Sequence, residues 1–253
     1  MGFSLCNPSL HTCKQFFKLF NNITNHTAII VDSYGLHVKC CNKKFKIDSI
    51  LDEISFKEYV CGREYILAIS IKQINSILHK YDDPNGNIPI RIIYSDQPSL
   101  LFIINNNSTY SIPCSIINNV PYIKRLHTLD DIDYHVEFEI PPKAFYRIIK
   151  QMKQISMSTH TSIINIHTQS DQQHIYINDT LLIPNANIDI YRFITNVNEY
   201  YSLEYINQIV KNSIKFSIQT LLFGVYTNKD MKIMAYLDDY NYIEYYISPL
   251  KTS

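Results

Sequence analysis

The sequence predicts an α+β fold built from two similar halves, with antiparallel sheets and two helices in each half. Three observations predict it: a long-range internal repeat, four amphipathic segments at helical spacing, and alternating apolar and polar residues between them. The length of 253 residues suggests two modest domains or one large one, and 46% apolar residues are enough for a sizeable core. Consecutive strands joined by short turns favour antiparallel sheets, with both helices of a half on one face.

Two pairs of segments repeat at nearly the same distance along the chain. Residues 14–21 match residues 143–150 at an offset of 129, and residues 71–78 match residues 203–210 at an offset of 132. An offset of this length indicates a duplicated domain, because solenoid units repeat every few tens of residues.

A linker separates the two halves. Residues 118–133 contain one proline, mixed charge and an acidic end, but no sustained hydrophobic period. The expected domains are therefore residues 1–117 and 134–253, and residues 118–133 connect them across the surface. The linker also carries three apolar residues that are unusual in a solvated loop: Val120, Ile123 and Leu126.

The four repeated segments have the apolar spacing of helices, and the rest of the chain alternates like strands. The helix after residue 142 follows two prolines, which a first helical turn tolerates. The helix over 71–78 ends before the turn-forming residues 82–87. Strands are predicted at residues 27–31, 36–40, 88–94, 100–104, 162–167, 174–178, 216–226, 231–237 and 242–247.

The charge and the cysteine content exclude several classes of protein. There are 23 Lys and Arg residues and 23 Asp and Glu residues, which argues against a basic protein that coats nucleic acid. No signal sequence or membrane-spanning stretch is recognised, and no C-x-x-C spacing occurs. We therefore expect an intracellular protein with reduced thiols at Cys6, Cys13, Cys40, Cys41, Cys61 and Cys114.

Catalytic and metal-binding motifs are missing from the sequence. H-E-x-x-H, G-x-S-x-G and G-x-x-x-x-G-K-[ST] do not occur, and five glycines leave little room for a phosphate-binding loop. His160, His167 and His174 are seven apart, but they fall on strand-like segments without a ligand pattern. We expect no enzymatic activity, no cofactor and no metal site.

Basic residues gather on the predicted helices. Lys143, Arg147 and Lys150 lie at i, i+4 and i+7 opposite an apolar stripe, and Lys14 and Lys18 form an i, i+4 pair. A solvated helix face explains each helix taken alone. If related helices align these faces on one surface, separated Lys and Arg residues suit phosphate contacts without sequence discrimination.

Four stretches carry a family resemblance that covers nearly the whole chain. The most specific is Ile-Glu-Tyr-Tyr-Ile-Ser-Pro-Leu at residues 243–250, which is similar to a closing Tyr-Tyr-x-x-Pro. Residues 55–78 resemble the family segment that leads into its second helix. Residues 140–147 resemble the start of its second domain, and residues 197–211 resemble its fourth helix. The family with this pattern is the sliding clamp of the proliferating cell nuclear antigen type.

The resemblance implies the DNA clamp fold and a ring, expected to be a homotrimer, around double-stranded DNA. Such a ring tethers a DNA polymerase, is opened by a clamp loader, and binds replication and repair proteins through short peptide motifs. The location that the resemblance implies is the nucleus, or a cytoplasmic replication site if the source is a cytoplasmic DNA virus. The residues that would face DNA are Lys14, Lys18, Asn21, Lys72, His79, Lys80, Lys143, Arg147, Lys150, Lys153, Lys211 and Lys215.

The resemblance also assigns a partner pocket and a subunit interface by position. The pocket for partner peptides would contain Cys41, Phe45, Val120, Ile123, Leu126, Met231, Tyr246, Ser248 and Pro249. Ring closure would pair strands that contain Tyr110, Ile112, Cys114, Leu181 and Ile183.

Some positions depart from the family pattern, and two other functions stay open. Glu204 stands where the family usually has a basic residue, Met231 replaces a pocket proline, and the net charge is zero where relatives are acidic. One alternative is a checkpoint-type or viral late-transcription clamp subunit. The other is a clamp-fold interaction scaffold without a role on DNA.

Overall fold

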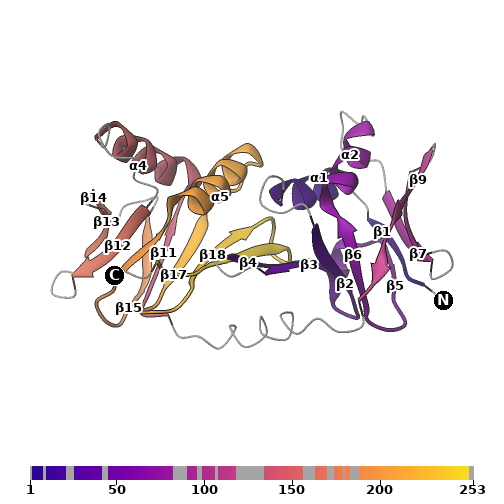
Figure 1. Cartoon of the computed structure of the whole chain (residues 1–253), viewed down its shortest axis with the longest axis horizontal. Helices are drawn as coiled ribbons and strands as arrows, with labels where there is room; N and C mark the ends of the chain where they lie inside the picture. Colours follow the sequence, from indigo (N-terminus) through magenta and orange to yellow (C-terminus); the bar gives the residue numbers. More distant parts are fainter. Residues whose placement is uncertain are drawn as a thin grey trace. The chain divides into compact units, whose positions relative to one another are not determined.

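The computed structural model describes residues 2–7, 10–20, 26–41, 45–81, 90–95, 99–105, 108–117, 134–155, 163–169, 174–178, 180–182 and 188–250. Over these residues the chain is α+β, with four α-helices, one short 3-10 helix and antiparallel strands (Figure 1). It divides into two compact units. The first contains Met1–Cys40, Asp48–His127 and Leu237–Tyr242, and the second contains Cys41–Ile47, Thr128–Tyr236 and Ile243–Ser253.

The first unit runs strand, helix, strands, helix, strands. Its elements are β1 (Ser4–Asn7), α1 (Leu10–Leu19), β2 (His26–Val31), β3 (Gly35–Cys41), η1 (Glu53–Ser55), β5 (Glu58–Val60), β6 (Tyr65–Ser70), α2 (Ile71–Lys80), β7 (Ile90–Ser95), β8 (Leu100–Asn105), β9 (Ser108–Pro113) and β10 (Ser115–Ile116), together with β4 (Phe45–Asp52) from Asp48 onward. One sheet has the strand order β5-β1-β7-β8-β9, and β10-β6-β2-β3-β4 are hydrogen-bonded neighbours in that order.

Aromatic residues of α1 and aliphatic residues of α2 fill the core of the first unit. Phe16 packs edge-on against Phe17 and Phe20, with ring centroids 5.3 and 5.5 Å apart. The Ser70 side chain caps α2 by accepting a hydrogen bond from the Gln73 backbone N–H. The two helices pack against each other, and their buried faces hold them on the strands.

The second unit repeats the order of strand, helix, strands, helix and strands. Its elements are β11 (Val136–Ile140), α4 (Pro142–Ile155), β12 (Ile163–Gln169), β13 (His174–Ile177), β14 (Thr180–Leu182), β15 (Asp189–Phe193), β16 (Asn198–Ser202), α5 (Leu203–Lys215), β17 (Leu221–Val225), β18 (Met231–Tyr236) and β19 (Tyr242–Ile247). One sheet has the order β14-β13-β12-β16, and β19-β18-β17-β11-β15 are hydrogen-bonded neighbours in that order.

Stacked aromatic rings join α4 to the sheet of the second unit. Phe223 of β17 stacks on Phe138 of β11 at 5.0 Å and on Phe145 of α4 at 4.9 Å. Nearby, Tyr134 lies directly on the backbone of Gly224, where an added Cβ would approach the ring's Cγ to 2.7 Å. The core of this unit is therefore closely packed around β17.

The structure confirms the α+β class and the helices, and it corrects one strand. The expected strand at 216–226 is wrong over its first residues, because α5 continues to Lys215 and β17 begins only at Leu221. The Phe216 N–H still bonds to Asn212 O, and Ser217 turns the chain with a positive φ of 59°. The linker at 118–133 lies outside the described residues, so the domain limits stay a prediction. No described helix is long and apolar enough to span a membrane.

Candidate nucleic-acid interface

Positive charge is concentrated on the four α-helices that the structure describes. Together they carry ten of the chain's 23 Lys and Arg residues, but only one of its 23 Asp and Glu residues, Glu204 in the first turn of α5. The neutral total therefore conceals a basic set of helices. Each helix buries its apolar face, and seven of the ten basic residues have exposed side chains: Lys72, Lys80, Lys143, Arg147, Lys150, Lys211 and Lys215.

In the first unit, α1 and α2 lie side by side over the strands (Figure 1). Their predicted DNA-facing residues are Lys14 and Lys18, which are half-buried, and Lys72, His79 and Lys80, which are exposed. Asn21, predicted on the same surface, lies outside the described residues.

Lys14 has a structural contact as well as a charge. Its Nζ donates a hydrogen bond to the carbonyl oxygen of Tyr81 at 2.6 Å, one residue beyond the end of α2. The last carbonyls of a helix lack partners within the helix, so a lysine there stabilises the helix end. Lys80 lies 5.0 Å from the Tyr110 ring centroid, which directs its ammonium group across that ring.

In the second unit, α4 and α5 pack against each other and present the larger basic group. Lys143, Arg147 and Lys150 are exposed on one face of α4, as their i, i+4, i+7 spacing predicts. Lys211 and Lys215 are exposed on α5. The helix α4 also contains Lys153, whose side chain lies outside the described ones.

A small cavity adds polar groups that the sequence did not indicate. It has a volume of about 300 Å³ and lies where α4 begins and α5 ends. Ser217 and Gln219 line it beside Lys143, and Pro141 and Ile218 form its apolar part. The turn at Ser217 makes this arrangement, and nothing in the apolar pattern distinguishes that turn from a continuing strand.

Three of the nine residues predicted for the partner pocket are buried in the second unit. Phe45, Met231 and Tyr246 are at most 2% exposed. The Phe45 ring stacks on the Tyr205 and Tyr245 rings, with centroids 5.0 and 6.1 Å apart. These side chains form core rather than the wall of an open groove.

Two pocket residues, Ser248 and Pro249, stay partly exposed after the last strand. The Ser248 hydroxyl donates to Asp230 Oδ1 at 2.7 Å, and Asp230 forms an ion pair with Lys46. The sequence did not single out this Lys46–Asp230–Ser248 chain, because its members are far apart along it. Cys41's side chain and the linker residues Val120, Ile123 and Leu126 lie outside the described side chains, so the pocket stays a prediction.

Among the strands that the structure describes, the two predicted to close a ring lie at the ends of sheets. β9 ends the order β5-β1-β7-β8-β9, and β14 ends the order β14-β13-β12-β16. Ile112 points into its own core at 1% exposed, whereas Tyr110 and Cys114 are half-buried. Leu181 lies in β14 and is paired with Tyr176 of β13. The side chain of Leu181, and all of Ile183, lie outside the described part of the chain.

The spaced histidines make aromatic contacts. His167 stacks on Tyr176 with ring centroids 4.8 Å apart, and His174 meets the same ring edge-on at 6.1 Å. Within the described parts of the chain, no group of three or more His, Cys, Asp or Glu residues could hold a metal ion. His160 and the acidic residues of the linker lie outside those parts.

Comparison with known proteins adds no assignment. Neither the protein-family models nor the curated proteins contain a match to this chain.

Proposed function

We propose that this chain is a subunit of a DNA sliding clamp, which encloses duplex DNA and tethers a DNA polymerase with other replication and repair proteins. The observation that carries the proposal is the charge segregation on α1, α2, α4 and α5. Ten basic residues against one acidic residue on these helices give each unit a basic helix pair suited to a polyanion, in a chain with no net charge.

The type of side chain favours backbone contacts over base recognition. Lys and Arg residues spaced along helices bind phosphates, which position a protein on DNA but do not read its sequence. A ring stays on DNA because it surrounds it, so each phosphate contact can be weak and the ring can move. A neutral chain with local basic faces suits a ring that must move along DNA better than a strongly basic chain does.

The positions of β9 and β14 support assembly into a ring. A strand at the end of a sheet has unpaired backbone N–H and C=O groups, which favour pairing with another chain. Pairing β9 of one copy with β14 of the next would satisfy both edges head to tail, and three copies would close the ring. A clamp loader would then open this interface around DNA.

Topological retention on DNA tests the proposal without needing the loader. The protein is incubated with a linear duplex that carries biotin at both ends, so a ring can thread on, and streptavidin then blocks the ends. We expect the protein to survive a high-salt wash on the blocked duplex and to be lost from an identical duplex with open ends. A protein held only by charge leaves both duplexes at high salt.

Equal loss from both duplexes would contradict encirclement. In that case, salt-sensitive binding would indicate a protein that binds the surface of DNA without enclosing it. The absence of any binding would favour a clamp-fold interaction scaffold without a role on DNA. Sedimentation of the same sample provides the second requirement, because a strictly monomeric species at micromolar concentration cannot form a ring.

A further inference from the structure

Three turns of the first unit carry apolar side chains that are unusually exposed. Tyr34 in the β2–β3 turn is 71% exposed, Ile54 in η1 is 67% exposed, and Tyr240 in the β18–β19 turn is 55% exposed. Single exposed apolar residues are common, but a group of them on adjoining turns marks a contact surface. We call residues 32–35, 52–57 and 238–241 the turn surface.

Hydrogen bonds hold the three turns together. The Glu53 N–H donates to Tyr34 O at 2.9 Å, which joins the first turn to η1. The buried side chain of Asn241 accepts from the Asp52 N–H at 2.9 Å and bonds to the Ser55 hydroxyl, which joins η1 to the third turn. These bonds place the segments that bear Tyr34, Ile54 and Tyr240 next to one another.

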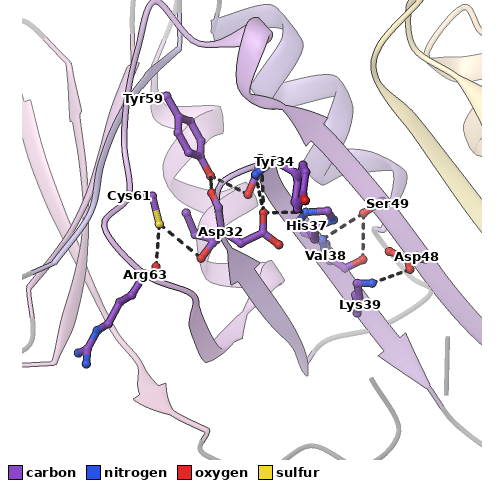
Figure 2. Close-up of polar contacts among 12 residues, drawn as sticks. Asp32, Tyr34, His37, Val38, Lys39, Asp48, Ser49, Tyr59, Cys61 and Arg63 are labelled. Atoms are coloured by element: carbon purple, nitrogen blue, oxygen red, sulfur yellow. Dashed lines mark hydrogen bonds and ion pairs between the residues drawn. The ribbon is translucent and has the colours of Figure 1, made fainter. Parts of the chain in front are cut away.

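Each turn is also fixed internally. Asp32 Oδ1 accepts from the Tyr34 N–H at 2.8 Å, and the Tyr59 hydroxyl lies 2.5 Å from Asp32 O (Figure 2). Asp238 accepts from the backbone N–H of Tyr240 at 3.0 Å and from the Asn241 side chain. The exposed side chains therefore stand on a rigid base, which lowers the entropy lost when a partner binds.

The turn surface is acidic in a chain whose total charge is zero. Its residues include five acids, Asp32, Asp52, Glu53, Asp238 and Asp239, and a single base, Lys57. Of the acids, Glu53, Asp238 and Asp239 are exposed. An acidic rim around apolar side chains repels DNA and attracts a basic partner.

We propose that the turn surface docks a segment of a partner protein that presents apolar side chains among Lys and Arg residues. Tyr34, Ile54 and Tyr240 supply the apolar contacts, and Tyr is a residue type that contributes strongly at interfaces. Glu53, Asp238 and Asp239 select the basic flanks. The site does not depend on ring formation or on the basic helices, so it stands or fails separately from the clamp function.

Peptide selection on the intact chain tests this site. A phage-displayed library of short random peptides is panned on the full chain and depleted on the variant Tyr34→Ser/Ile54→Ser/Tyr240→Ser. The matched control is Ile163→Ser/Tyr191→Ser/Ile194→Ser, which removes three other exposed apolar side chains from the second unit. Thermal unfolding of both variants establishes that they fold.

We expect the selected peptides to combine at least two apolar residues with several Lys or Arg residues. Their affinity should fall by about tenfold or more in the turn-surface variant and stay unchanged in the control. Replacing Glu53→Lys and Asp239→Lys should weaken binding and reduce its dependence on salt. Failure to select any peptide, peptides without basic residues, or equal affinity for both triple variants would overturn the proposal. Self-association of the chain that disappears in the turn-surface variant would overturn it too, because a second copy would then occupy the surface.

Discussion

Charged and titratable residues of β3 and β4 are held in a half-buried row in the first unit. Lys39 is only 3% exposed, and its Nζ lies 2.7 Å from Asp48 Oδ2. His37 lies two residues earlier on the same strand, with Nε2 3.4 Å from Asp32 Oδ1 (Figure 2). A buried charge requires a partner, so this row links the stability of the sheet to protonation.

The stability of the protein should fall in mild acid because of His37. Burial lowers the pKa of His37 from its ordinary value of 6.5; Asp32 and Asp48 oppose this effect, and Lys39 adds to it. Folding therefore favours the neutral ring. This contribution is complete above the unfolded-state pKa and is lost as the pH falls through the folded-state pKa.

Urea unfolding of the wild type and of His37→Gln at about pH 7.5 and about pH 5 measures this contribution. We expect the free energy of unfolding of the wild type to fall more between the two pH values than that of the variant. An identical change in both proteins would show that His37 is not the group responsible.

At the scale of single elements, α2 is stabilised at both of its ends. Ser70 caps its beginning, and Lys14 from α1 binds the carbonyl oxygen of Tyr81 just after its end. One lysine of the proposed DNA surface therefore has two roles. Lys72, on the exposed face of α2, contributes only its charge to that proposed surface.

Lys14→Ala and Lys72→Ala should separate these two roles. Each variant removes one positive charge from the helices, so we expect similar losses of DNA affinity. Only Lys14→Ala also removes the bond to Tyr81, which should lower the free energy of unfolding by about 1 to 3 kcal/mol. Lys72→Ala should change it by less than about 0.5 kcal/mol in the same urea titration. Equal stability of the two variants would refute the structural role of Lys14.

The helices were predictable from sequence because their stability depends on a local apolar stripe. Phe145 and Ile149 are buried as the spacing of α4 predicts, and the basic residues opposite them are exposed. The end of α5 was not predictable, since Ser217 adopts a positive φ that its residue type rarely favours. Contacts such as Lys46–Asp230 and Asn241–Ser55 join residues more than a hundred positions apart, and no periodicity encodes them.

In the chain as a whole, the distribution of charge matters more than its sum. The helices are basic and the turn surface of the first unit is acidic, so one neutral chain has surfaces of opposite charge. Binding to DNA should therefore depend on which lysines are removed, although every such change alters the net charge equally.

Salt-dependent binding of duplex DNA measures that difference. Lys143→Ala/Arg147→Ala/Lys150→Ala should reduce the slope of log affinity against log salt by up to about 3, because each phosphate that is no longer neutralised lowers it by about 0.9. The control Lys57→Ala/Arg63→Ala/Lys229→Ala removes three exposed basic residues outside the helices and should leave the slope unchanged. If both variants change the slope equally, DNA is not bound by the helices.

The close approach between Tyr134 and Gly224 limits how this sequence can evolve. Gly224 is paired with Glu137 on one side and with Lys232 on the other, so its backbone cannot retreat from the ring. Any side chain there would push its Cβ to within 2.7 Å of Tyr134. Positions 134 and 224 should therefore change together in evolution. A lineage that loses Gly224 must first replace Tyr134 with a smaller residue.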